Sequence, residues 1–122
     1  MLFRSGAKKM SRTIINISIK GKEQELLDKE IRNILIADDY REIDYNREVV
    51  WKKGTGLMTA MHYIKIEYSN DTLTVSGWVQ IGLGSVGGKE SSLEGFSAKI
   101  PKKSVKNTIE KIRTVVESFH QV

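Results

Sequence analysis

The sequence predicts an α+β fold, an antiparallel sheet in β-α-β-β-β-β-β-α order with two helices on one face. Three observations lead to this prediction. Isoleucines alternate with polar residues over 15–19, apolar residues recur at helical spacing over 26–35 and again over 105–119, and five short strand patterns lie between the two helical segments. Segregated helices beside a meander of strands are typical of an α+β domain.

The first strand and the first helix follow from these periodicities. Residues 15–19 predict a half-buried strand, which Gly21 ends. The next segment predicts a helix over 22–37, in which Asp28 and Arg32 form a favourable i,i+4 pair.

Two short strands are expected after this helix. One places Ile43 and Tyr45 on the same face, residues 46–48 form a turn, and 49–51 return as the second strand. The segment 52–56, with two glycines, is expected to be a loop.

The best-determined element is a hairpin with strands at about 60–68 and 73–82. A two-residue loop at Asn70-Asp71 fixes its register, because both residue types tolerate left-handed backbone geometry. A slip of one residue would place Lys65 and Glu67 in the core. The expected pairs are Tyr68 with Leu73, Ile66 with Val75, Ile64 with Gly77 and His62 with Val79 on the apolar face, and Glu67 with Thr74, Lys65 with Ser76, Tyr63 with Trp78 and Met61 with Gln80 on the other.

The C-terminal part contains a glycine-rich loop, a strand and a helix. Gly82–Gly88 includes the spacing G-x-G-x-x-G, but a strand pattern at 93–100 follows in place of the helix that a dinucleotide site requires, so a hairpin loop is the better interpretation. Pro101 marks the start of the last helix. Its apolar stripe consists of Val105, Ile109, Ile112, Val115, Val116 and Phe119.

The charge of the chain is concentrated near its start. Of a net charge of +5 over 122 residues, four positive charges lie in the first twelve residues, which contain no acid. We interpret residues 1–12 as a disordered or artefactual tail, with the natural chain starting at Met10 or further upstream, and 13–122 as a single domain. The domain then carries 16 basic and 15 acidic residues, a net charge of +1, which weakens any inference to nucleic acid.

Composition excludes several kinds of chemistry. Without cysteine the chain has no disulfide, thiolate metal site or cysteine nucleophile, and two histidines offer little for a metal site. No apolar run is long enough to span a membrane, and no nucleophile motif is recognisable. We therefore expect a cytoplasmic, non-enzymatic protein without catalytic residues, metal or cofactor.

Aromatic residues suggest a binding surface. Tyr63 and Trp78 are expected to pair across the hairpin on its less apolar face, flanked by Met61, and Trp51 lies on a nearby strand. Exposed aromatic clusters are enriched at protein interfaces, so these four residues are the candidate site for a protein partner. The alternative is that another element, such as the strand that carries Trp51, covers them and makes them part of the core.

The sequence also allows two other kinds of binding site. A carrier of a small apolar ligand would hold it between the sheet and the last helix, in a cavity of about 300 Å³ or more. Its candidate lining is His62, Ile64, Ile66, Val79 and Phe119. The last helix also carries a cationic face, and Lys102, Lys103 and Lys106 are weak candidates for binding an anionic membrane or nucleic acid.

Several segments carry a family resemblance. These are Val49-Val50-Trp51-Lys52-Lys53-Gly54, Tyr63-Ile64-Lys65-Ile66, Val75-Ser76-Gly77-Trp78, Leu93-Glu94-Gly95-Phe96 and Ile100-Pro101-Lys102-Lys103. Over roughly 30–117 the chain resembles a domain of uncharacterised Gram-positive bacterial proteins, some with a preceding zinc ribbon that this cysteine-free chain lacks. The family implies no activity. In architecture the chain is also similar to helix-grip (START-like) folds, which implies the ligand cavity named above.

Overall fold

The computed structural model describes residues 11–54, 60–81, 89–94 and 99–120. The elements follow in the expected β-α-β-β-β-β-β-α order. They are β1 (Thr13–Ser18), α2 (Gln24–Ala37), β2 (Arg41–Tyr45), β3 (Glu48–Lys53), β4 (Met61–Ser69), β5 (Thr72–Ile81), β6 (Lys89–Ser91) and α3 (Lys99–Ser118). The strands form one antiparallel sheet in the order β1-β5-β4-β3-β2, and β6 pairs with the end of β5 that extends past β1.

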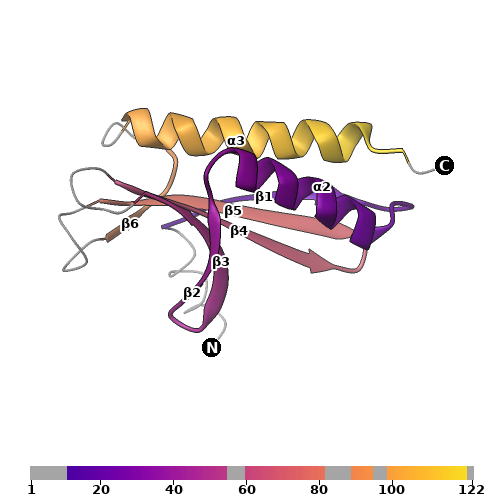
Figure 1. The fold of residues 1–122 in the computed structure, drawn as a ribbon, viewed down its shortest axis with the longest axis horizontal. Coiled ribbons are helices and arrows are strands. Elements are labelled where there is room, and N and C mark those ends of the chain that lie inside the picture. The colour runs from indigo at the N-terminus through magenta and orange to yellow at the C-terminus, as the bar shows by residue number, and fades with distance from the viewer. Residues whose placement is uncertain (1–10, 55–59, 82–88, 95–98, 121–122) are drawn as a thin grey trace.

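The two helices lie on the same face of the sheet (Figure 1), which confirms the predicted α+β architecture. Each helix presents a buried apolar stripe, Leu27, Ile31 and Leu35 on α2 and Val105, Ile109, Ile112 and Val116 on α3. These side chains form the main core with the apolar face of β4 and β5. The helices therefore cover one side of the sheet, as the sequence periodicity predicts.

The β4–β5 hairpin has the predicted register. Ser69 pairs with Thr72 around the loop, Tyr63 pairs with Trp78, and Met61 pairs with Gln80. Asn70 has a left-handed φ of 52° in the loop, a conformation that asparagine tolerates. The alternation of apolar and polar residues was therefore sufficient to fix this part of the sheet.

A second, smaller core lies on the other face of the sheet. Val50, Met61, Tyr63 and Trp78 are buried there, with the half-buried Ile43 and Tyr45 packed against them. The β2–β3 hairpin extends away from the helices (Figure 1), and Tyr45 from this hairpin contacts the ring of Tyr63.

Three boundaries differ from the sequence prediction. Strand β6 lies at Lys89–Ser91, before the segment 93–100 predicted as a strand. In that segment Leu93 is buried in the main core and belongs to no strand, 99–100 belong to α3, and 95–98 lie outside the described residues. Helix α3 begins at Lys99, two residues before Pro101. The tail expected over 1–12 does not include Arg12, whose guanidinium is ion-paired to Glu48 and Glu90; residues 1–10 lie outside the described residues.

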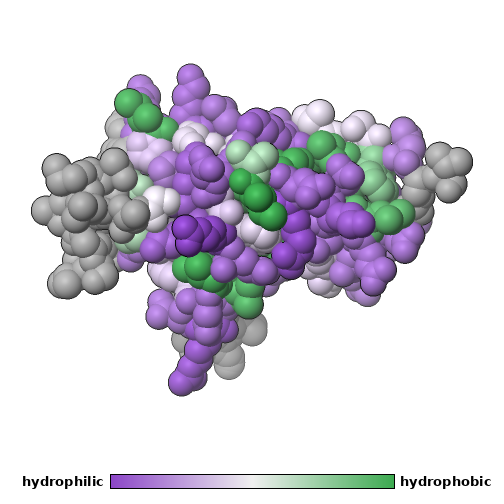
Figure 2. Space-filling view, in the orientation of Figure 1, coloured by the Kyte–Doolittle hydropathy of each residue, from purple (hydrophilic) through white to green (hydrophobic). Residues whose placement is uncertain are grey.

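On the face shown in Figure 2, hydrophobic residues form separate patches among hydrophilic ones. The large hydrophobic residues most exposed in the described chain are Ile14, Leu26, Ile36, Val49 and Ile100. No helix in the described part of the chain is both long and apolar enough to cross a membrane.

Candidate functional site

The four aromatic-site candidates do not share one surface. Trp51 pairs with Ile64 across β3 and β4 and belongs to the main core, on the helix side of the sheet. Met61, Tyr63 and Trp78 belong to the smaller core on the opposite side. Because successive side chains of a strand point to opposite faces, the register that places Trp51 beside Ile64 separates it from Tyr63.

The expectation that Tyr63 and Trp78 lie exposed is wrong. Trp78 has no exposed surface and Tyr63 only 2%. The two rings stack with their centroids 5.3 Å apart, and the Arg12 guanidinium covers the Trp78 ring at 3.7 Å from its centroid. In the described structure these aromatic residues are therefore a covered second core, the alternative that the sequence left open.

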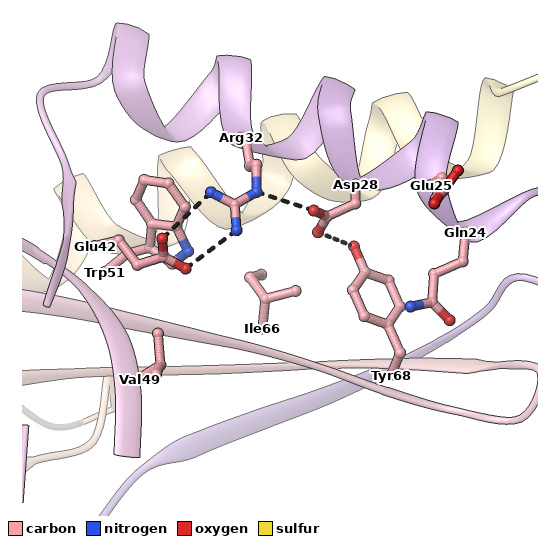
Figure 3. A pocket seen from close by; sticks show the side chains of 9 residues that line it. All are labelled: Gln24, Glu25, Asp28, Arg32, Glu42, Val49, Trp51, Ile66 and Tyr68. Carbon is pink, nitrogen blue, oxygen red and sulfur yellow. Dashed lines mark hydrogen bonds and ion pairs between the residues drawn. The ribbon is translucent and has the colours of Figure 1, made fainter. Parts of the chain in front are cut away.

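Trp51, in contrast, lines a surface pocket of about 310 Å³ between α2 and strands β2–β4 (Figure 3). The helix supplies the polar side of this pocket and the strands supply most of its apolar side. The lining residues are Gln24, Glu25, Asp28 and Arg32 of α2, Glu42 of β2, Val49 and Trp51 of β3, and Ile66 and Tyr68 of β4. We call this the α2 pocket.

A hydrogen-bond network centred on Arg32 holds the α2 pocket together (Figure 3). Arg32 Nε donates to Asp28 Oδ2 at 3.0 Å, and its Nη1 and Nη2 donate to the Glu42 carboxylate at 3.3 and 3.2 Å. Tyr68 Oη donates to Asp28 Oδ1 at 2.6 Å. These contacts join the helix to β2 on one side and to β4 on the other.

The same network determines the protonation of Tyr68. Burial raises the pKa of its hydroxyl, and the hydrogen bond to Asp28 raises it further, so the hydroxyl stays protonated as a donor. Asp28 accepts hydrogen bonds from both Tyr68 and Arg32. These groups fix the shape of the pocket, and both oxygens of Asp28 are already used.

The floor of the α2 pocket is apolar and partly open. Trp51 is 6% exposed, with the Arg32 guanidinium 5.4 Å from its ring centroid. Val49, on the same strand as Trp51, is 59% exposed at the edge of this floor. An exposed apolar side chain beside an apolar floor is able to accept an apolar group from another molecule.

The rim of the α2 pocket has an acidic excess. Three carboxylates line it, those of Glu25, Asp28 and Glu42, against the single cation Arg32. Asp28 and Glu42 are ion-paired to Arg32, while Glu25 is exposed in the first turn of α2. The rim therefore keeps a net charge of −2, one negative charge in the Arg32 network and one at Glu25.

The carrier residues lie on the helix side of the sheet, but in a filled core. Ile64 and Val79 are fully buried, and Ile66 and Phe119 pack against the same core. Gly77 of β5 pairs with Ile64, and a Cβ atom at Gly77 would lie 2.7 Å from Ile109 Cδ1 of α3. Helix and sheet are thus in direct contact at this point, which leaves no room there for a ligand.

His62 lies on β4 next to Gly54, the residue that follows β3. Burial lowers the pKa of its imidazole, and the positive charge of Lys53 lowers it further, so the ring is neutral at pH 7. In the part of the chain that the structure describes, no group of three or more His, Cys, Asp or Glu side chains is arranged to hold a metal ion.

The three candidate anion-binding lysines differ in exposure. Lys103 and Lys106 are exposed on α3. Lys102 is only 3% exposed, and its Nζ donates to the backbone carbonyl of Glu94 at 2.9 Å. Lys102 is therefore a buried structural residue, and the expectation that it presents its charge to an anionic partner is wrong.

Sequence reasoning missed most of the α2 pocket. It identified the Asp28–Arg32 pair as helix stabilisation, and the structure confirms that pair. The signal for a site was the combination of this pair with Tyr68, a tyrosine on the apolar face of the hairpin whose hydroxyl needs a polar partner. The contact of Glu42 with Arg32 depends on how the β2–β3 hairpin folds back, which no local pattern encodes.

Comparisons with known proteins found no match for the chain. No family model matches the chain, and no curated protein or solved structure matches it either.

Proposed function

We propose that this chain is a non-enzymatic binding module that holds a segment of a partner protein in the α2 pocket. The observation that carries the proposal is Val49, a 59% exposed hydrophobic residue at the edge of a pocket floored by Trp51 and Ile66. An apolar side chain placed there would bury Val49 and the floor, at about 25 cal/mol per Å² of apolar surface.

The charge of the rim selects the chemistry of the partner. Three carboxylates against one arginine leave the rim with a net charge of −2, and Glu25 is the carboxylate that lies outside the Arg32 network. We therefore propose that the partner segment carries a lysine or arginine next to its apolar side chain. Charge complementarity of this kind favours the right partner and speeds its association.

The arrangement supports binding better than catalysis. The Tyr68 hydroxyl stays protonated, and the two carboxylate oxygens of Asp28 already accept hydrogen bonds from Tyr68 and Arg32. A general base needs a free acceptor within reach of a substrate proton. We also propose that this binding takes place in the cytoplasm. We propose, in addition, that the chain belongs to the family of uncharacterised Gram-positive proteins that it resembles.

Selection from a random peptide library on the immobilised chain tests the proposal. We expect enrichment of peptides with adjacent apolar and basic residues. Their affinity should fall at least about tenfold, equivalent to about 1.4 kcal/mol, in the Val49→Asp variant, since a carboxylate at the floor rejects an apolar group.

Matched variants make this test specific. Ile100→Asp changes an 84% exposed hydrophobic residue outside the pocket and should leave binding intact. Glu25→Lys should weaken binding, while Glu30→Lys, an exposed glutamate of the same helix that does not line the pocket, should not. If the selected peptides bind Val49→Asp and wild type equally, the α2 pocket is not the binding site.

A further inference from the structure

A second polar arrangement, independent of the α2 pocket, surrounds the side chain of Arg12 on the opposite face of the sheet. Five residues contribute to it, each from a different strand. They are Tyr45 of β2, Glu48 of β3, Tyr63 of β4, Trp78 of β5 and Glu90 of β6. We call this set the guanidinium cage.

The carboxylates of the cage engage every nitrogen of the Arg12 guanidinium. Glu90 accepts from Nε at 2.9 Å and from Nη2 at 2.8 Å. Glu48 accepts from Nη1 at 3.1 Å and from Nη2 at 2.8 Å. Two bidentate carboxylates around one planar cation match the fork geometry that distinguishes arginine from lysine.

The aromatic part of the cage provides a flat surface for the same cation. The guanidinium carbon lies 3.7 Å from the centroid of the Trp78 ring, the stacking geometry of a cation–π contact. Tyr63 stacks on Trp78 with an interplanar angle of 10°, and Tyr45 lies 4.7 Å from Tyr63 between ring centroids. The platform is therefore fixed by other rings and does not depend on Arg12 for its orientation.

The carboxylates are also positioned without Arg12. Lys65 Nζ donates to Glu48 at 2.8 Å, and Tyr45 Oη donates to Glu90 at 3.2 Å. None of the five cage residues belongs to β1, the strand that follows Arg12. The cage is thus complete on the body of the sheet, and Arg12 enters it from outside.

The element that delivers Arg12 is an edge of the sheet. Strand β1 pairs with β5 on one side, and Arg12 directly precedes its first residue, Thr13. Edge strands and segments near their ends open at lower free energy than the centre of a sheet. Removal of Arg12 from the cage requires local opening at this end of β1, which also breaks the contacts of Ser11 with Glu90 and of Thr13 with Leu93 and Glu94.

One donor of the cage is unused. Trp78 Nε1 is buried and has no hydrogen-bond partner in the described structure. A guanidinium cannot satisfy it, because arginine has no acceptor in its side chain. The peptide carbonyl groups that flank Arg12 do not reach this donor. The acceptor would have to come from a partner segment whose backbone crosses the cage in another direction than residues 11–13.

We propose that the guanidinium cage is a binding site for an arginine side chain of a partner polypeptide, and that Arg12 occupies it as an intramolecular substitute. The site recognises a planar cation stacked on Trp78 and held by Glu48 and Glu90. Arg12 then regulates access, because a ligand must displace a group tethered at high effective concentration.

Titration of the Arg12→Ala variant of the full chain with Nα-acetyl-arginine N-methylamide tests this proposal. The Trp78 indole N–H resonance reports on the cage, and the Trp51 indole on the far side of the sheet is the internal control. We expect saturable shifts of Trp78 at millimolar ligand, little change at Trp51, and an affinity at least about tenfold weaker in wild type, where Arg12 competes.

Three controls decide the chemistry. The corresponding lysine derivative should bind far more weakly, and Glu90→Gln in the Arg12→Ala background should abolish binding of the arginine derivative. A preference for unblocked L-arginine over the blocked derivative overturns the assignment to a polypeptide. Absence of a saturable shift at Trp78 in folded Arg12→Ala shows that Arg12 is a structural residue only, and overturns the proposal.

If Arg12→Ala does not fold, a second measurement still tests the proposal. Refolding of this variant in methylguanidinium, compared with equal methylammonium at the same ionic strength, then becomes the readout. Recovery of native tryptophan resonances in methylguanidinium alone supports a cage that accepts a guanidinium from outside the chain. Recovery in neither cation, or in both equally, overturns it.

Discussion

Gly77 of β5 lies beneath Ile109 of α3, so close that a Cβ atom at Gly77 would come within 2.7 Å of Ile109 Cδ1. The same atom would lie 3.1 Å from Leu93 Cδ1 and 3.2 Å from Val105 Cγ1. The missing side chain at this position is therefore what allows the C-terminal helix to rest directly on the sheet.

The Gly77→Ala variant should be less stable than wild type. Overpacking costs about 1–3 kcal/mol, which exceeds the roughly 0.4–1 kcal/mol that a Gly-to-Ala change gains through the unfolded chain. Urea unfolding should show a lower midpoint with an unchanged slope. Adding Ile109→Val, which removes the clashing Cδ1 atom, should recover part of the loss; strict additivity of the two changes would show that Ile109 does not limit the space at Gly77.

Trp78 should behave as a core residue and not as a contact residue. Because its side chain has no exposed surface, Trp78→Ala should destabilise the fold by about 3–5 kcal/mol, the usual range for a buried aromatic truncation. Thermal unfolding followed by far-UV circular dichroism measures the loss. A Trp78→Ala protein as stable as wild type would restore the view that this ring is a dispensable surface group.

The parts of the fold that local patterns encode were predictable. The register of β4 and β5 follows from strict alternation around a two-residue loop, and the order of elements follows from three changes of periodicity. The side of the sheet on which Trp51 lies was not predictable in the same way. It depends on the pairing of β3 with β4, and the seven residues between these strands, 54–60, are too many for the sequence to fix the register as a two-residue loop does.

Contacts distant in sequence decided the rest. Arg12 covers Trp78 although 65 residues separate them, and a charge pattern that looked like a tail gave no indication of this contact. No local pattern links Glu48 with Glu90, and only the assembled sheet brings both carboxylates to one guanidinium. Burial of a charged group becomes visible only when the elements that surround it are assembled.

Acid should reveal the contribution of Arg12 to stability. The hydrogen bonds from Arg12, which outweigh the opposing effect of burial, lower the pKa of Glu48 from its usual 4.5 to about 2. A carboxylate whose pKa is lower in the folded state stabilises the fold above its unfolded pKa, and this stabilisation disappears as pH falls through the folded value. We therefore expect the free energy of unfolding to decrease between about pH 5 and pH 2.

The Arg12→Ala variant should reduce this acid dependence. It removes the main cause of the Glu48 shift while Lys65 still donates to the carboxylate. The stability difference between wild type and Arg12→Ala, about 2–3 kcal/mol near neutral pH, should narrow as the pH falls. Arg41→Ala, at an exposed arginine of β2, is the control and should run parallel to wild type. If the free energy of unfolding of Arg12→Ala runs parallel to that of wild type over this pH range, Arg12 is not the main cause of the lowered pKa of Glu48.

Two adjacent lysines of α3 should differ in their effect on stability. Lys102 is 3% exposed and donates to the Glu94 carbonyl, whereas Lys103 is exposed to solvent. Lys102→Ala should lower the free energy of unfolding by about 1.5–3 kcal/mol, because it removes a charged hydrogen bond and leaves the Glu94 carbonyl without its donor. Lys103→Ala should change the free energy of unfolding by less than about 0.5 kcal/mol. Lys102→Met keeps the apolar stem and should fall between them, because part of the role of a buried lysine is packing. Urea unfolding of the three variants measures the order, and equal effects of Lys102→Ala and Lys103→Ala would show that the first turn of α3 is held by its apolar residues alone.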